Sequence, residues 1–393
     1  MISLDFLPTE RPPWRPASAP PTSAMLAAIA ASSARLAALP SHLGAPLRAR
    51  FARGEAAAFV LNSNRLELVG TQDDAETHAL CERATATAAA PDRKTRETLQ
   101  TLLALRCAHR LREEARAALA GEGAAPHHVL LVTPDSQCEV HAELMRGLVA
   151  RPGSYRCADA RPQGFSFLYP PPEAISNRML AWTDAINDLV TALPAVSLPC
   201  AFLLAALVLF HSVDAHAFED GNGRLCRILA SAMLSEHHFF PVGVQPLIAP
   251  PSDGSAHEDS CPRSHLAWRS VYIGAIEACR GDAARRPADL AALLIESSWA
   301  AWQRVEALVA QTVDGEGAAL LGDIVLGGRV GLAARARVSA RWESLCHCRR
   351  LGGKPEGAAA REEDIDRLCA AAGGGGAPAP VRLQDGCVVH VFA

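Results

Sequence analysis

The chain has few aromatic side chains and only a small net charge. Phe, Trp and Tyr make up 5% of its 393 residues, whereas 49% are hydrophobic and alanine is abundant. This composition is ample for a core and favours helices. The formal net charge of -4 at pH 7 gives no bias toward polyanions, so we do not expect a nucleic-acid partner.

The sequence also lacks a clear membrane or secretory segment. Its most apolar run, 193–213, is interrupted by Pro194, Ser197 and Pro199, which favours a buried core helix over a membrane span. The first residues, MISLDFLPTERPPWRP, are acidic and proline-rich where a signal peptide needs a basic start and an apolar run. We expect no membrane partner and a cytoplasmic location, while a nuclear location and organelle import stay open.

Cofactor signatures are sparse outside one stretch. Twelve cysteines occur at irregular spacing, and reduced intracellular thiols are the safer interpretation. The cluster Cys346, His347 and Cys348 has no further ligands at zinc spacing. No P-loop and no protein-kinase signature is present, so phosphate chemistry of those types is not supported.

The stretch HAFEDGNGRLCR, 216–227, lies between two predicted helices. The apolar run 201–210 precedes it, and apolar residues at helical spacing follow it. Gly221, Asn222 and Gly223 occupy the turn, where glycine allows positive φ and close backbone approach. The free N–H groups at the start of the second helix would face this turn and form an anion cradle.

The side chains of this stretch suit phosphate chemistry. Arg224 and Arg227 are three positions apart on the second helix, so both can lean toward one phosphate tail. His216 can accept a proton near neutral pH. Asp220 is a hard oxygen ligand for Mg2+, and Phe218 is expected to anchor the loop to the core.

Two other interpretations of the stretch are weaker. A structural histidine beside a helix-capping turn would not need an acid, a histidine and two arginines together. A metallohydrolase helix carrying His211 and His216 fails on geometry, because residues five apart lie about 140° apart around a helix.

The stretch resembles the signature of the Fic family, H-P-F-x-[DE]-G-N-[GK]-R-x-x-R. Every chemically active position is filled, and the one departure is Ala217, where proline is usual. The resemblance implies a mainly α fold, with a Fic-type helical core, a short β-hairpin flap and extra helices before and after it. It also implies transfer of AMP from ATP to a Ser, Thr or Tyr hydroxyl of a target protein.

The resemblance assigns a role to each matching residue. His216 is implied as the catalytic base and Asp220 as the ligand of Mg2+, with ATP as the donor. The phosphate-binding residues are implied to be Gly221, Asn222, Gly223, Arg224 and Arg227.

The stretch NSNRLELVG places Ser63 and Glu67 four positions apart on one helix face. It resembles the family's inhibitory helix, [ST]-x-x-x-E-[GN], although Leu68 stands where glycine or asparagine is usual. The resemblance implies that Glu67 pairs with Arg227, displaces the γ-phosphate and holds the enzyme in a low-activity state. The competing interpretation is that Ser63 caps a helix and Glu67 is a solvated carboxylate.

Two segments between the inhibitory helix and the signature also resemble the family. PGSYR, 152–156, is similar to its G-x-[YF]-R segment. In GFSFLYPPPE the alternation of Phe165, Phe167 and Tyr169 is typical of a short exposed strand. This place in the family holds the flap, which receives the target segment by strand pairing. A simple hairpin or loop is the alternative.

Several residues carry structural predictions only. Pro40 and Pro46 are expected to break the helical sequence between 23 and 52. His141, alone on an apolar helix face, is expected to be a satisfied core residue.

The chain is predicted to have four regions and a C-terminal hairpin in VRLQDGCVVHVFA with Asp385 and Gly386 at its turn. The regions are a disordered Pro-rich leader (1–24), a helical region (25–125) that carries the inhibitory helix (about 59–70), the Fic core (126–304), and an extension of unknown role with a Gly-rich linker (305–393).

Within the family the signature leaves the chemistry partly open. Relatives use other nucleotides, transfer phosphocholine or phosphate, or remove AMP with the same glutamate. The alternatives to an adenylyltransferase are therefore a bifunctional enzyme that acts mainly as a de-AMPylase, and a Fic-fold binding or regulatory module with little catalysis. The expected partner is a target protein with an accessible hydroxyl, and a homodimer is compatible with the sequence.

Overall fold

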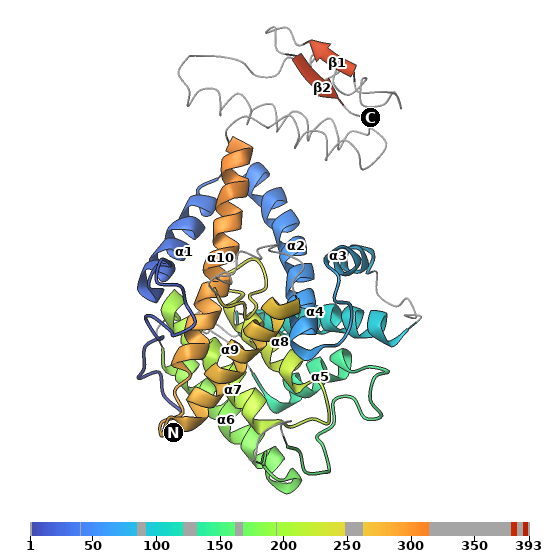
Figure 1. The fold of residues 1–393 in the computed structure, drawn as a ribbon, viewed down its shortest axis with the longest axis vertical. Helices are drawn as coiled ribbons and strands as arrows, with labels where there is room; N and C mark the ends of the chain where they lie inside the picture. Colours follow the sequence, from blue (N-terminus) through green and yellow to red (C-terminus); the bar gives the residue numbers. More distant parts are fainter. Residues whose placement is uncertain are drawn as a thin grey trace. The chain divides into compact units, whose positions relative to one another are not determined.

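A computed structural model describes residues 2–39, 41–84, 92–120, 132–161, 168–193, 195–247, 262–313, 379–382 and 388–391. Within these ranges the protein is mainly helical (Figure 1), as the sequence predicted. The predicted flap residues Phe165 and Phe167 lie outside the described residues. The helices are α1 (Thr22–Ala37), α2 (Ser41–Glu67), α3 (Asp74–Arg83), α4 (Arg93–Ala120), α5 (Pro134–Leu144), α6 (Pro172–Ala192), α7 (Leu198–Ala215), α8 (Asn222–Leu234), α9 (Pro262–Gly281) and α10 (Ala288–Val313).

The chain divides into two compact units. One comprises Met1–Ala31 and Arg50–Ala301, and the other comprises Ser32–Ala49 and Trp302–Ala393. The described residues of the signature, of the inhibitory segment and of the flap all belong to the first unit.

The second unit contains the predicted C-terminal hairpin. Strands β1 (Ala379–Arg382) and β2 (Val388–Val391) pair antiparallel. In this register Ala379 lies opposite Val391, and Arg382 lies opposite Val388. The predicted turn at Asp385 and Gly386 lies outside the described residues.

Helix α7 forms the centre of the first unit. All residues from 201 to 210 are buried. Among the described helices only α7 is long and apolar enough to cross a membrane, but 78% of it is buried inside the fold, as predicted for a core helix. The Ser197 hydroxyl accepts the Cys200 N–H at 3.4 Å, and Pro199 lies in the first turn, so these two interruptions of the apolar run are helix-start signals. Pro194 lies outside the described residues.

Helix α2 is longer than predicted. Pro46 was expected to break a helix, yet it lies inside the continuous α2, Ser41–Glu67. Because Pro46 is in the second turn, its missing N–H removes only one backbone bond near the helix start. The segment predicted as a separate inhibitory helix is therefore the C-terminal end of a 27-residue helix.

The Pro-rich leader is not disordered over its described residues, contrary to the prediction. Arg15 Nε donates to Glu296 Oε1 at 2.5 Å, and Trp14 Nε1 donates to Glu296 Oε2 at 3.0 Å. The Arg15 and Glu296 side chains are 1% and 0% exposed. Removing either partner of such a buried pair would leave an uncompensated charge, so this contact fixes the leader against α10.

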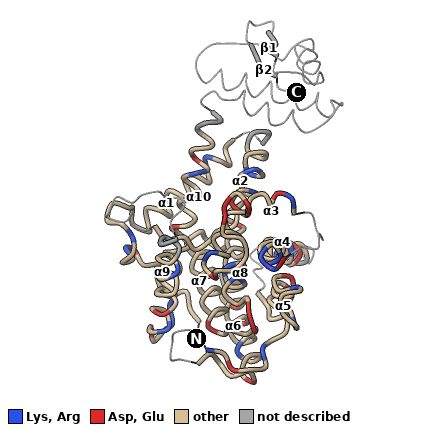
Figure 2. The backbone as a smooth tube through the Cα atoms, turned by 45° about the vertical axis from the view of Figure 1, so that its right-hand side comes forward, with Lys and Arg blue, Asp and Glu red and all other residues tan. Residues whose placement is uncertain are grey.

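Short segments of Lys and Arg and short segments of Asp and Glu are scattered over the described chain (Figure 2). Two arginines of α8 are buried, although arginine usually lies at the surface. Arg224 and Arg227 in α8 are 1% and 2% exposed. Buried cations need a partner, so the start of α8 is the natural place to look for a site.

Candidate active site

The loop between α7 and α8 is closed by one side chain. His216 ends α7 in the left-handed conformation, with φ 43° and ψ 51°, and Gly221 precedes α8 with φ 78°. Asn222 Oδ1 accepts the Phe218 N–H at 3.0 Å, and Asn222 Nδ2 donates to the Phe218 carbonyl at 2.8 Å. Asn222 was predicted to bind phosphate, and because its side chain is used within the loop, its backbone N–H is the group left for an anion.

Phe218 anchors the loop, as predicted. It is 1% exposed and stacks on His141, with ring centroids 3.9 Å apart. His141 Nδ1 accepts the Gly153 N–H at 2.9 Å, so Nε2 carries the proton and donates to the Asp220 carbonyl at 2.9 Å. Burial lowers the pKa of His141 to about 4. His141 is thus a neutral structural residue.

Arg156, from the PGSYR segment, clamps the other side of the loop. It is 6% exposed, and its Nε donates to the His216 carbonyl at 2.7 Å. Its backbone N–H donates to the Ala217 carbonyl at 2.9 Å, and Tyr155 forms a β-bridge with Phe218. The sequence identified this segment but not its role in fixing the backbone of His216.

The His216 ring lies between the loop and Tyr169. The two rings stack with centroids 3.9 Å apart and planes 8° apart. Burial lowers the pKa of His216 to about 4, while the Val213 carbonyl acts in the opposite direction. At neutral pH the imidazole is therefore uncharged and can accept a proton.

The start of α8 meets the requirements of an anion site. Gly221 supplies no side-chain cap, and the first intrahelical bond runs from the Leu225 N–H to the Gly221 carbonyl at 2.9 Å. The amides of Asn222, Gly223 and Arg224 therefore have no acceptor within the helix. The buried Nε and Nη1 atoms of Arg224 make no hydrogen bond. A buried cation with two unsatisfied donors fits a phosphate group.

Asp220 is the one carboxylate of the loop placed to hold Mg2+ beside such phosphates. Its side chain is 52% exposed, and its Oδ2 lies 3.9 Å from Arg224 Nη2. Within the described ranges no group of three or more His, Cys, Asp or Glu side chains could hold a metal ion. Magnesium would therefore be held by Asp220 together with oxygens of a bound nucleotide.

The predicted contact between α2 and α8 is in place. Arg227 Nη1 donates to Glu67 Oε1 at 2.8 Å. Arg227 Nε and Nη2 donate to the Ser63 hydroxyl at 3.1 Å and 3.0 Å. A Cβ on Gly223 would lie 2.1 Å from Glu67 Oε1. Gly223 is thus required for the close approach of this carboxylate to α8.

The end of α2 is held in position from two sides. Arg269 Nε donates to the Leu66 carbonyl at 3.1 Å. After the helix, the Gly70 N–H donates to Glu97 Oε2, and the Thr71 N–H donates to the Thr98 hydroxyl, both at 2.8 Å. These contacts with α9 and α4 place Glu67 on α8 through its backbone as well as its side chain.

Leu68, which follows α2, has φ 57° and a side chain in solvent. The left-handed conformation costs an L-residue with a Cβ about 1 kcal/mol or more and costs glycine little. This explains why the related pattern has glycine or asparagine at this position.

We expect Leu68→Gly to raise the free energy of unfolding by roughly 0.5–1 kcal/mol, because it relieves this backbone strain. Leu68→Ala is the matched control, since it removes the same exposed side chain but keeps the strain. Urea unfolding of the two variants compares them directly. Equal stabilities would show that the conformation of Leu68 stores no strain.

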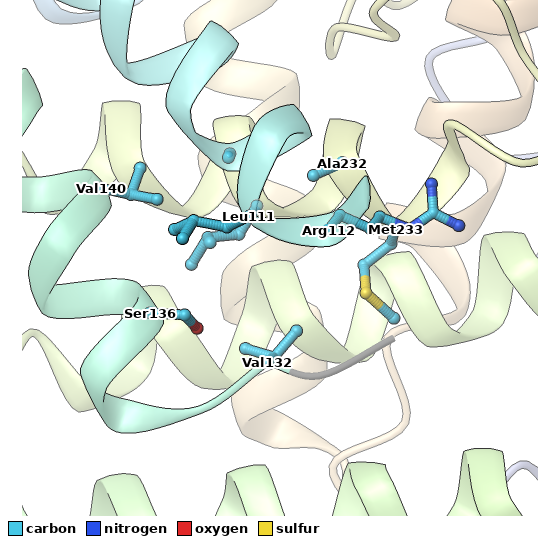
Figure 3. A pocket seen from close by; sticks show the side chains of 9 residues that line it. Leu111, Arg112, Val132, Ser136, Val140, Ala232 and Met233 are labelled. Carbon is cyan, nitrogen blue, oxygen red and sulfur yellow. The ribbon is translucent and has the colours of Figure 1, made fainter. Parts of the chain in front are cut away.

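A small cavity lies away from this loop, between α4, α5 and the second half of α8 (Figure 3). Its volume of about 30 Å³ leaves room for about one water molecule. The lining is largely apolar and includes Val140, Leu229 and Met233. Its size excludes a nucleotide.

The comparisons with solved structures define the class of fold. A Fic family protein from Desulfovibrio desulfuricans G20 superposes with a TM-score of 0.50 at 16% identity, covering 85% of this chain and 86% of that chain. Fic-1 from C. elegans gives a TM-score of 0.50 at 17% identity, covering 74% of this chain and 73% of that chain. At such identities these likenesses show a shared Fic-type fold.

The family follows from the sequence of the core. Residues 131–234 match the model of the Fic/DOC family, a range that contains the whole stretch 216–227. The chain thus carries a Fic/DOC family domain and is, in general terms, a Fic-type enzyme or module. Proteins with this domain are generally transferases that act on proteins. None of the curated proteins matches the chain in sequence.

The structure brings most predicted site residues together. His216, Arg224, Arg227, Glu67 and Ser63 lie around the loop and the start of α8, while Phe165 and Phe167 fall outside the described residues. Sequence reasoning missed Asp214, which is buried two positions before His216. The signal was available, because a carboxylate inside a long apolar helix needs ionic partners.

Proposed function

We propose that the protein transfers AMP from ATP to a Ser, Thr or Tyr hydroxyl of a target protein. The observation that carries this proposal is the pairing of two unusual side chains at the two ends of one loop. His216 is held neutral by burial, and Arg224 is buried with two unsatisfied donors. One group can accept a proton from a nucleophile, and the other can bind the nucleotide that it attacks.

The proposed reaction uses these groups in one displacement. His216 takes the proton of the target hydroxyl while its oxygen forms a bond to the α-phosphorus. The bond from the α-phosphorus to the bridging oxygen breaks, and pyrophosphate leaves with the electron pair. Arg224 and the amides at the start of α8 stabilise the charge on the phosphates. Bound Mg2+, held by Asp220, would add positive charge there.

The contact between Glu67 and Arg227 supports an inhibited resting state. Arg227 is the other arginine of α8 suited to a terminal phosphate, and its guanidinium is occupied by Glu67 and Ser63. ATP would have to displace the carboxylate to use this cation. We therefore propose that the protein has low basal transfer activity when ATP is supplied.

The same contact favours a second candidate function, removal of AMP from a modified target. The Glu67 side chain is 35% exposed, so a water molecule could reach it beside the loop. A carboxylate in that place could activate this water for attack on an AMP-modified hydroxyl.

The position of the label in ATP distinguishes the transfer reactions. With Mg2+ and a Glu67→Gly background, we expect protein labelling from ATP labelled at the α-phosphorus and none from ATP labelled at the γ-phosphorus. Labelling from the γ-position alone would instead indicate phosphate transfer. ATP binding with no labelling from either position, in the presence of a cell extract as the source of targets, would favour a binding module.

A further inference from the structure

Three arginines converge on one buried carboxylate beside the loop. Asp214 lies near the end of α7 and is 5% exposed. Its Oδ1 accepts a hydrogen bond from Arg280 Nε at 3.0 Å, and its Oδ2 accepts one from Arg178 Nη2 at 2.5 Å. Arg285 forms an ion pair with the same carboxylate, with 3.0 Å between its Nη2 and Oδ2. The carboxylate thus gathers side chains from α6, α9 and the turn before α10, and places positive charge at the C-terminal end of α7.

One of these arginines connects the carboxylate to the ring that covers His216. The Arg280 guanidinium lies over the Tyr169 ring, with 5.6 Å between its central carbon and the ring centroid. Arg280 is itself fixed, because its Nε donates to Asp214 Oδ1 and its Nη1 donates to Glu277 Oε1 at 2.6 Å. The cation–π contact with this fixed guanidinium restrains the Tyr169 ring.

The stack with Tyr169 limits how His216 can be reached. The planes of the two rings differ by 8°, so Tyr169 shields one face of the imidazole. The charged groups that act on His216 are Arg156, Arg280 and Glu67. The arginines oppose protonation of the imidazole, and Glu67 favours it. A hydroxyl that gives its proton to the imidazole has to approach a ring nitrogen in the ring plane.

We propose that Tyr169, held by Arg280 and Asp214, is a positioning residue that fixes the ring plane of His216 and the direction from which a target hydroxyl reaches it. The structural half of this proposal, that Tyr169 fixes the ring plane of His216, rests on the contacts alone. The positioning half, that this plane sets the approach of the target hydroxyl, rests on the proposed transferase function.

The structural half is tested by NMR of the histidine ring carbons and protons in the full chain, without any substrate. Stacking on Tyr169 shifts the His216 signal, which is assigned by its loss in His216→Ala. We expect the shift to disappear in Tyr169→Ala and in Tyr169→Leu and to persist in Tyr169→Phe. In Tyr169→Ala the pKa of His216 should rise from about 4 toward the ordinary value near 6.5, by about one unit or more, because one face becomes hydrated.

Tyr169→Leu keeps apolar volume in the same place, so it tests the stack if Tyr169→Ala does not fold. Thermal unfolding of each variant establishes which ones are folded. A His216 signal that is unchanged in a folded Tyr169→Ala or Tyr169→Leu variant would overturn the proposal.

The positioning half is tested by label transfer in the Glu67→Gly background. We expect kcat to fall by about tenfold or more in Tyr169→Leu with the KM for ATP unchanged, and to stay within about threefold in Tyr169→Phe. An acid limb of the pH profile that moves upward in Tyr169→Ala would support the same role. Loss of the NMR shift without loss of kcat would refute it. If the NMR changes occur but no variant transfers label, the proposed transferase function fails, whereas the proposal that Tyr169 fixes the His216 ring is still supported.

Discussion

Replacing His216 by alanine is expected to abolish label transfer from ATP while leaving ATP binding intact. Loss of a general base typically lowers the rate by about 10²–10⁴-fold. The imidazole lies on the opposite end of the loop from the buried guanidinium of Arg224, so the nucleotide affinity should change by less than about threefold. The comparison requires a Glu67→Gly background, because the protein that keeps His216 then transfers label fast enough for such a loss to be measured.

His78→Ala is a suitable control for this substitution. His78 lies on α3, where it pairs with Asp74, and its side chain is 37% exposed. None of the contacts described for His78 is with the loop, so its removal should leave the transfer rate unchanged. Transfer that persists at the parental rate in His216→Ala would remove His216 as the base. Loss of both transfer and ATP binding would point to collapse of the loop.

Replacing Glu67 by glycine is expected to raise self-labelling by roughly tenfold and to tighten ATP binding. The reason is that Arg227 loses its carboxylate partner and becomes available to the nucleotide. An ion pair with one buried and one partly exposed member contributes modestly, about 1–2 kcal/mol, and this corresponds to roughly a tenfold effect. Titration calorimetry with ATP and quantification of incorporated label would measure both quantities.

Leu68→Gly is the matched control, because it places a glycine at the same helix end and keeps the carboxylate. It should not raise labelling. Glu67→Gln keeps the shape but removes the charge, so we expect an intermediate effect. Equal labelling by wild type and Glu67→Gly would exclude the inhibitory role. A modified target that loses AMP with wild type but not with Glu67→Gly would establish the second candidate function.

The local chemistry of the site could be predicted from the sequence because its parts are close together in the chain. The turn, the amides of α8 and the two arginines all lie within 216–227, where helical periodicity fixes their relation. The contact between Glu67 and Arg227 joins positions 160 residues apart. It was predicted only because the residues around Glu67 resemble a known inhibitory pattern.

The remaining contacts depend on tertiary packing that no local pattern contains. Arg15 meets Glu296 across 281 positions, so a composition typical of disorder gave the wrong result for the leader. Tyr169 was assigned to the target-binding flap because its place in the chain resembles that of the family's flap, and nothing local indicates that its ring stacks on His216. The closure of the loop by the Asn222 side chain was not predicted, because it depends on the shape of the loop.

If ATP binds as proposed, Glu67 and a phosphate group would compete for the space beside Gly223. The Glu67 carboxylate fills the space that a Cβ would take, and this space adjoins the amides that would receive a phosphate. If the Glu67 carboxylate and a phosphate of ATP need the same space, ATP alone could relieve the inhibition, and no separate activator would be required. The active fraction of the protein would then follow a simple saturation curve in ATP concentration. The ATP concentration at half-saturation would be set by the strength of the contact between Glu67 and α8.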